Sequence, residues 1–319
     1  MSAPSLPTGL GAIWAPVRAS LSLVWRVPRA RMGLLMLGAF VLVALVGPWF
    51  VGDPNMLVAR PLQPPSWDHW LGTSGQGQDV LAQTVVGTRR SLAIGFGVGV
   101  AVVVLGALIG IVAATVTGVI DTVLSSLTQI VLVLPGLPLA IVIAAYLPSG
   151  PLTVALVLVL TGWAWNARVV RSQALTLRSR DFVAAARVAG DSRWGIMATA
   201  ILPNLSSLLF SQLVGSVTYA IGAEVGLGFL GLGDVSVVTW GTNLYWATND
   251  SALLTGAWWT FVPGGVCIAL VGYALVLLSS GLDEVSNPRL RSRAPWVRFV
   301  TAGGGVVGNA TPVVRRGGP

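Results

Sequence analysis

Long apolar stretches without a single charged residue constrain this chain more than any other feature of its sequence. They occupy residues 32–51, 91–120, 122–167, 194–223 and 251–282. A helix that crosses the hydrocarbon core of a bilayer needs about 20 apolar residues. The composition agrees, because 54% of the residues are hydrophobic and only 9% are charged, unlike the balance of a soluble domain. We therefore expect an all-α membrane protein.

The stretch 122–167 is long enough for two helices, and the Leu-Pro-Ser-Gly-Pro segment at 147–151 predicts a turn that divides it. The sequence therefore predicts six transmembrane helices. We expect them near residues 32–51, 91–116, 124–147, 151–171, 204–230 and 261–282.

The arginines predict the orientation of these helices. The net charge of +8 would suggest nucleic-acid binding in a soluble protein. With the N-terminus in the cytoplasm, however, only Arg60, Arg89 and Arg90 fall on the outer side, and the other arginines all fall on cytoplasmic segments. The positive-inside rule accounts for this distribution without any nucleic acid. We expect both termini in the cytoplasm (N-in/C-in), the lipid bilayer as the surroundings and no nucleic-acid partner.

Absent residue types limit the chemistry. The chain contains no lysine, so it cannot form the phosphate-binding loop of ATPases, in which a lysine contacts the β- and γ-phosphates. His69 and Cys267 are the only residues of their kinds, which excludes a His/Cys zinc cluster and a disulfide within the chain. We expect no catalytic residues, no metal and no cofactor. Any ATP hydrolysis must then occur on a separate polypeptide.

A polar loop at 172–203 separates two of the apolar stretches. Residues 182–189 are long enough for about two helical turns, with Asp181 as the expected N-cap and Gly190 as the end. Asp191 or Ser192 is then expected to cap a second short helix. An Ala-rich, capped helix in a loop is suited to contact with a soluble partner. The alternative is an ordinary connection between two membrane helices.

This loop resembles the cytoplasmic coupling loop of ABC importer permeases. That loop contains Glu-Ala-Ala, a Gly four residues later and a downstream Ile-x-Leu-Pro. Ala184 stands where the family usually has Glu, and Ala200 where it has the first Ile. The matching positions are Ala185, Ala186, Gly190, Leu202 and Pro203.

Other motifs are similar to those of the dipeptide/oligopeptide/nickel branch of these permeases. Ser74 and Gln78 depart from the branch pattern, but the order and spacing of the motifs match across about 30–291. The motifs are His69-Trp70-Leu71-Gly72-Thr73, Asp79-Val80-Leu81, Leu134-Pro135-Gly136-Leu137, Phe229-Leu230-Gly231-Leu232-Gly233, Trp240-Gly241 and Asn287-Pro288-Arg289-Leu290-Arg291.

The resemblance implies a type I ABC importer permease fold in the bacterial cytoplasmic (inner) membrane. It implies a second homologous permease subunit, two cytoplasmic ATPase subunits and an extracytoplasmic substrate-binding protein. This chain would form half of the translocation pathway. Peptides are the expected substrate, with nickel or another small solute as the alternative. A secondary transporter would usually need more spans and internal repeats, or intramembrane ion ligands beyond Glu224. A channel would need a selectivity filter or a charged ring, and the sequence shows neither. A membrane scaffold explains the apolar helices but not the coupling loop.

The resemblance also points to residues that contact the ATPase. We expect Phe182, Ala185, Ala186 and Ala189 to share one helical face, with Phe182 as the anchor. We expect Arg187 to lie off that face. The expected ATPase-coupling residues are Asp181, Phe182, Ala185, Ala186, Arg187, Gly190 and Asp191.

Two features within the apolar stretches are candidates for the pathway or a subunit interface. Pro135 and Pro138 each remove a backbone donor, so we expect a kink around Gly136 in the third helix. That kink would line a cavity or serve packing. Glu224 has apolar sequence on both sides, so it should face protein or water rather than lipid.

The two ends of the chain lie outside the resemblance. Residues 1–31 contain Trp14 and Trp25 among arginines, which favours a cytoplasmic interfacial helix or a disordered arm. Residues 292–319 are rich in Gly, Pro and Arg, which favours a disordered cytoplasmic tail.

Overall fold

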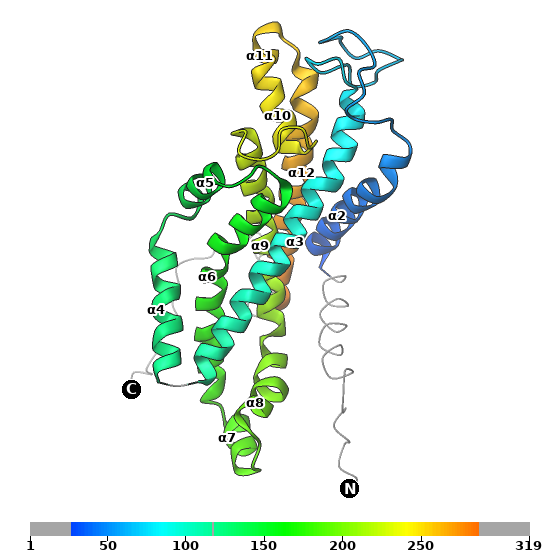
Figure 1. Cartoon of the computed structure of the whole chain (residues 1–319). Coiled ribbons are helices and arrows are strands. Elements are labelled where there is room, and N and C mark those ends of the chain that lie inside the picture. Colours follow the sequence, from blue (N-terminus) through cyan, green and yellow to red (C-terminus); the bar gives the residue numbers. More distant parts are fainter. Residues whose placement is uncertain (1–26, 117, 287–319) are drawn as a thin grey trace, which may run out of the picture.

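The computed structural model describes residues 27–116 and 118–286, which form a long bundle of helices (Figure 1). The expectations for 1–31 and 292–319 therefore fall outside the described residues, apart from the start of the first described helix. The helices are α2 (Pro28–Val46), α3 (Val80–Thr115), α4 (Val119–Val133), α5 (Gly136–Tyr146), α6 (Pro151–Arg178), α7 (Asp181–Val188), α8 (Arg193–Ile196), α9 (Leu202–Phe229), α10 (Trp240–Asn249), α11 (Ala252–Thr255) and α12 (Val262–Ser286), with short helical turns η1 (Gly47–Trp49), η2 (Met197–Ile201) and η3 (Trp258–Thr260).

Five of the described helical segments are long and apolar enough to cross a membrane, and a sixth span results if the bent pair α4–α5 counts as one. This agrees with the six spans expected from the apolar stretches. The segments are Pro28–Trp49, Val80–Thr115, Pro151–Arg178, Arg193–Phe229 and Val262–Leu282, with Val119–Val133 plus Gly136–Tyr146 as the bent pair.

Helix α3 occupies the centre of the bundle and packs along both α6 and α9 (Figure 1). Small residues allow this close approach. A Cβ atom at Gly110 would lie only 2.5 Å from the carbonyl oxygen of Ala167 in α6, and one at Gly99 would lie 2.5 Å from a methyl group of Val217 in α9. Membrane helices associate through such small residues because water supplies no hydrophobic force between them.

Asp79 fixes the beginning of α3. Its Oδ1 atom accepts a hydrogen bond from the backbone N–H of Ala82 at 2.9 Å, as an N-cap does. Its Oδ2 atom lies 3.0 Å from Nδ1 of His69. The single histidine therefore helps to hold the segment before α3 against the start of that helix.

The chain breaks between α4 and α5 rather than bending within one helix. The two helix axes meet at 88°. Leu134 and Pro135 have extended backbone angles, and α5 starts directly at Gly136. The expected kink is thus a complete interruption, because Pro135 has no N–H and also forces Leu134 out of the helical region.

Pro203 does not interrupt its helix. From Arg193 the chain runs through α8, the wide π turn η2 and α9 to Phe229. The N–H of Leu202 bonds to the carbonyl of Met197, five residues earlier. A π turn is wider than an α turn, and we attribute its place here to Pro203, whose ring would clash with a preceding carbonyl in a regular helix.

The end of the bundle opposite α7 and α8 carries a cap that the sequence did not predict (Figure 1). It contains α10 and α11, which follow the long helix α9. Thr239 and Thr242 form a reciprocal capping box at the start of α10. Gly241 of α10 packs closely on Gly228 of α9, where a Cβ atom would lie 3.1 Å away.

Candidate functional site

Helix α7 stands at the far end of the bundle, beyond the ends of α3 and α6 (Figure 1). Its buried face attaches it to the bundle. Val183 has no exposed surface and lies in a cluster with Val170 and Ala174 of α6 and Ile196 of α8. Ala186, one turn later, packs against the same cluster. The helix is therefore seated on the bundle through the face that carries positions 183 and 186.

The opposite face of α7 is open. Phe182 is 42% exposed and Val188 is 90% exposed. Ala185 and Ala189 are exposed as well. Phe182, Ala185 and Ala189 of the expected face are exposed together. Ala186, the fourth residue of that face, is instead half-buried against the bundle. Val183 and Val188 were missed, although the spacing of three between 183 and 186 is a helical signal for a buried side.

The N-terminal end of α7 differs from the expectation. Asp181 was expected to be the N-cap, and this was wrong, because the cap position is Arg180 and no side chain accepts a hydrogen bond there. Asp181 lies instead in the first turn of the helix. Its negative charge is still well placed, because the exposed N–H groups at a helix N-terminus carry partial positive charge.

The C-terminal end of α7 is firmly closed. The N–H of Asp191 donates to the carbonyl of Ala186 and that of Gly190 to the carbonyl of Arg187, both at 3.1 Å. This pair of bonds is a Schellman motif, which requires a left-handed residue. Gly190 has a φ of 89° and supplies it. Ser192 then caps α8 by accepting from the N–H of Gly195 at 3.0 Å, so Ser192 rather than Asp191 is the second cap.

A basic cavity of about 370 Å³ lies beside α7. Arg187 lines it, off the exposed apolar face, as expected. Arg178 in the same cavity donates to the carbonyl oxygen of Ala114 at 3.0 Å. The cavity is lined by Thr115, Arg178, Val183, Arg187, Asp191, Arg193, Ile196 and Ile201. With three guanidinium groups and one carboxylate, it is suited to acidic groups of a partner.

A larger cavity, of about 660 Å³, lies at mid-height between α6 and α9. The break at Leu134 and Gly136 forms part of its wall. Asn166 of α6 donates to Oγ of Ser216 in α9 at 3.0 Å. The side-chain oxygen and nitrogen of Gln212 are buried there without a partner. The residues that line this cavity are polar or apolar, and none of those described carries a charge.

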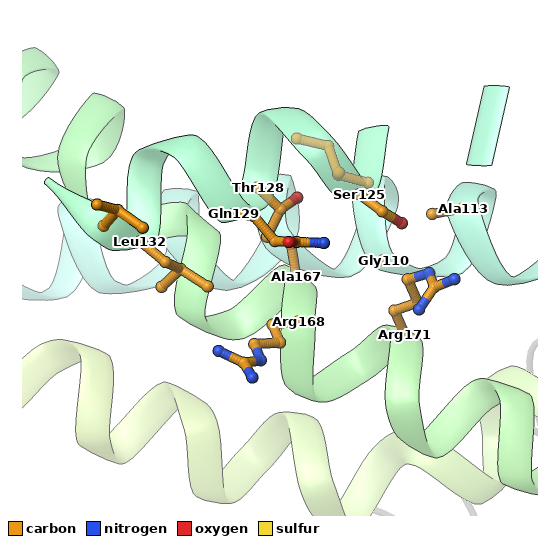
Figure 2. Close-up of a pocket in the computed structure, with 11 residues that line it drawn as sticks. Gly110, Ala113, Ser125, Thr128, Gln129, Leu132, Ala167, Arg168 and Arg171 are labelled. Carbon is orange, nitrogen blue, oxygen red and sulfur yellow. The ribbon is translucent and has the colours of Figure 1, made fainter. Parts of the chain in front are cut away.

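A neighbouring cavity, of about 500 Å³, lies between α3, α4 and α6 (Figure 2). Arg171 makes two bonds to Asp121 of α4, at 2.9 and 3.0 Å, which tie α4 to α6. Arg168 lies one turn away on α6, and Gln129 lines the cavity from α4. Arg168 and Gln129 were not singled out by the sequence. The available signal was an arginine directly after the apolar stretch 122–167.

Glu224 is enclosed by its own chain, with 3% of its surface exposed. Its carboxyl group lies beside the side chains of Ser91 in α3 and Thr239 before α10. Its Oε2 atom is buried without a partner and borders a cavity of about 20 Å³, which has room for about one water molecule. Ser91 also accepts from the N–H of Trp240 at 3.1 Å. Glu224 therefore lies where α3, α9 and α10 meet, away from lipid.

Comparison with known proteins identifies the family to which this chain belongs. Residues 106–292 match the family described as binding-protein-dependent transport system inner membrane component. The chain belongs to this family. The match runs from the last part of α3 onward and includes the loop with α7 and α8.

Three curated relatives cover most of the chain. A putative peptide transport system permease protein of Brucella suis is 36% identical over 87% of this chain and 93% of its own length. The dipeptide transport system permease protein DppC of Bacillus subtilis is 32% identical over 82% of both chains. The oligopeptide transport system permease protein OppC of Mycobacterium tuberculosis is 33% identical over 84% of this chain and 91% of the relative.

Proposed function

We propose that this family member is one of two permease subunits of an ATP-driven peptide importer in a bacterial cytoplasmic membrane. The permease character follows from the family. The peptide substrate is supported by the names of the relatives in Brucella suis and Bacillus subtilis. The remaining parts of the machine would be a second permease, two cytoplasmic ATPase subunits and an extracytoplasmic binding protein.

The observation that carries the proposal is the construction of α7. Val183 seats the helix on α6 and α8, and the Gly190 turn fixes its end. Phe182, Ala185 and Val188 remain exposed on it. A helix transmits force to a partner only when one side is held and the other is free to dock in a groove. We infer that α7 couples the ATPase to the membrane helices, with Arg187 and Asp191 at the edge of the contact.

The cavity between α6 and α9 is the proposed part of the translocation pathway. Polar side chains are costly at membrane depth unless they face protein or a water-filled space. The interrupted backbone at Pro135 and Gly136 is tolerated at that depth for the same reason. Both features border one cavity. Glu224 lies outside that cavity, so we assign it a structural role in holding α10 on α3 and α9.

A pull-down of the whole assembly tests the proposal. The tagged chain is purified from gently solubilised membranes of cells that also express the neighbouring genes, and the bound proteins are identified by mass spectrometry. We expect a second permease and two ATPase subunits in equal amounts with the chain. A chain that purifies alone, in membranes where those proteins are present, would contradict the proposal.

A further inference from the structure

Arg168 differs from the other arginines of its helix. Arg171 is paired with Asp121, and Arg178 bonds to the carbonyl of Ala114. Within the described residues, no hydrogen bond or ion pair is found for Arg168. The side chain of Arg168 is exposed on the protein surface. The guanidinium group of Arg168 is therefore free to bind a ligand, whereas those of Arg171 and Arg178 are bound within the chain.

The position of Arg168 places it toward the inner end of the pathway. It lies seventeen residues after the first residue of α6, Pro151, which corresponds to about 25 Å along the helix. The hydrocarbon core of a bilayer is about 30 Å thick. Arg168 therefore lies near the cytoplasmic boundary of this span, in agreement with the positive-inside rule. A guanidinium group without a partner in the chain is free there to bind an anionic group.

Arg168 borders the smaller of the two cavities and lies on the same face of α6 as residues that line the larger one. It lines the cavity of about 500 Å³ together with Thr128 and Gln129 of α4 (Figure 2). On the same side of α6, one and two turns earlier, Trp165 and Thr161 line the cavity of about 660 Å³. A solute that moves along α6 through the larger cavity thus arrives at Arg168.

The charges of the residues that line the two cavities indicate which kind of chemical group Arg168 can bind. Among the described residues that line either cavity, Arg168 and Arg171 are the only charged ones, and Arg171 is paired. The guanidinium group is planar and binds a carboxylate through two parallel hydrogen bonds. The neutral donors and acceptors of Thr128 and Gln129 are suited to the adjacent amide groups.

We propose that Arg168 binds the C-terminal carboxylate of the peptide at the inner part of the pathway, an inference that rests on the proposed peptide transport. Arg168 pairs with the carboxylate when the peptide leaves the larger cavity, and the amide of Gln129 contacts the last peptide group. The pathway thereby favours a free C-terminus and tolerates varied side chains.

The test uses the complete importer in liposomes, with trialanine and trialanine amide as the probes. The amide lacks the terminal negative charge and is otherwise the same size. Initial uptake rates are measured at a saturating concentration of the binding protein. The ratio of the two rates is compared between variants, because any preference of the binding protein is the same in each and cancels.

We expect the acid-to-amide ratio to fall about tenfold in Arg168→Gln, which is the effect of losing one charge-assisted pair. Arg168→Lys should retain part of the preference, because it keeps the charge without the planar fork. Arg29→Gln, which changes an exposed arginine at the start of α2 outside both cavities, is the matched control and should leave the ratio unchanged. ATPase activity and assembly should be normal in all three variants.

An unchanged ratio in Arg168→Gln would overturn the inference, and so would an equal loss in Arg168→Lys. Repeating the assay in vesicles of pure phosphatidylcholine separates a lipid role. If Arg168 binds an anionic lipid headgroup instead, both probes will be affected equally and only in vesicles that contain phosphatidylglycerol, which contradicts the inference. Failure of the wild-type importer to take up either probe would instead refute the proposed peptide transport.

Discussion

Glu224, Gln212 and Arg168 are polar side chains among apolar helices, and their surroundings assign them different roles. Glu224 is enclosed by α3, α9 and α10 beside Ser91 and Thr239. Gln212 borders the larger cavity without a partner, and Arg168 is exposed between the two cavities. A buried polar group is stabilising only when it is hydrogen-bonded. We therefore infer a structural role for the enclosed Glu224. We infer a ligand-binding role for Arg168, because its guanidinium group has no partner among the described residues.

Substitution of Glu224 tests its structural role. Glu224→Gln keeps an acceptor for the hydroxyl groups of Ser91 and Thr239, so we expect a loss of at most about 1 kcal/mol. Glu224→Leu leaves both hydroxyl groups without that acceptor and should cost about 1–3 kcal/mol. Thermal unfolding of the purified complex measures the difference. A leucine variant with wild-type stability and transport would contradict a structural role for the carboxyl group of Glu224.

Substitution of Phe182 tests the proposed anchor. Phe182→Ala removes a large side chain from the exposed face of α7, so we expect ATPase binding to weaken by about 2 kcal/mol, or about thirtyfold in Kd. Titration of the purified permease pair with the ATPase measures this affinity. Phe50→Ala removes the same side chain from an exposed position at the other end of the molecule and should have no effect. Equal affinities for both variants would remove Phe182 from the interface.

At the scale of elements, α7 is attached to the end of the bundle through its buried face. Val183 packs among residues of α3, α6, α8 and α9, so a displacement of α7 reaches several membrane helices together. The closed turn at Gly190 passes the same displacement to α8, which continues through η2 into α9. We infer that α7 moves as one piece with these helices, because packed interfaces shift between discrete arrangements rather than deform gradually.

Gly190→Val tests this connection. Gly190 has a φ of 89°, a conformation that a β-branched residue resists. We expect the variant to insert and assemble, and to hydrolyse ATP with uptake reduced about tenfold or more. Gly52→Val is the matched control, because Gly52 has open space around it and no left-handed backbone. The ratio of peptide taken up to ATP hydrolysed is measured for both. Normal coupling in Gly190→Val would contradict the role of the turn.

The elements also show what a sequence pattern can and cannot predict. The apolar stretches predicted the membrane helices, and Gly190 and Ser192 predicted an end and a cap, because these depend on local chemistry. Asp181 was wrongly expected to be a cap, since the helix begins at that residue itself. Helix α10 was missed because its stability comes from packing on α9. The position of Gln212 beside a cavity depends on the packing of α3, α4, α5, α6 and α9 and has no local signal.

At the scale of the whole molecule, the two ends differ in charge and in shape. The arginines from Arg168 to Arg193 belong to the end with α7, whereas Arg60, Arg89 and Arg90 belong to the end with α10 and α11 (Figure 1). The positive-inside rule places the end with α7 in the cytoplasm, where ATPase subunits would bind. We propose that the opposite cap faces the binding protein.

Cysteine labelling tests this orientation. In a Cys267→Ala background, single cysteines replace the exposed arginines, as Arg60→Cys or Arg180→Cys. We expect a membrane-impermeant maleimide to label position 60 in intact cells, and position 180 only after the membrane is opened. Labelling of both positions from the same side would contradict the six-span topology.

The central claim is that this chain transports while other chains hydrolyse ATP. The most direct measurement compares the purified chain alone with the complete importer in liposomes, with ATP hydrolysis and trialanine uptake recorded in parallel. The chain contains no lysine and hence no phosphate-binding loop of the usual ATPase kind, so alone it should show neither activity. The complete importer should show both. ATP hydrolysis by the chain alone, or hydrolysis by the complete importer without uptake, would contradict the account.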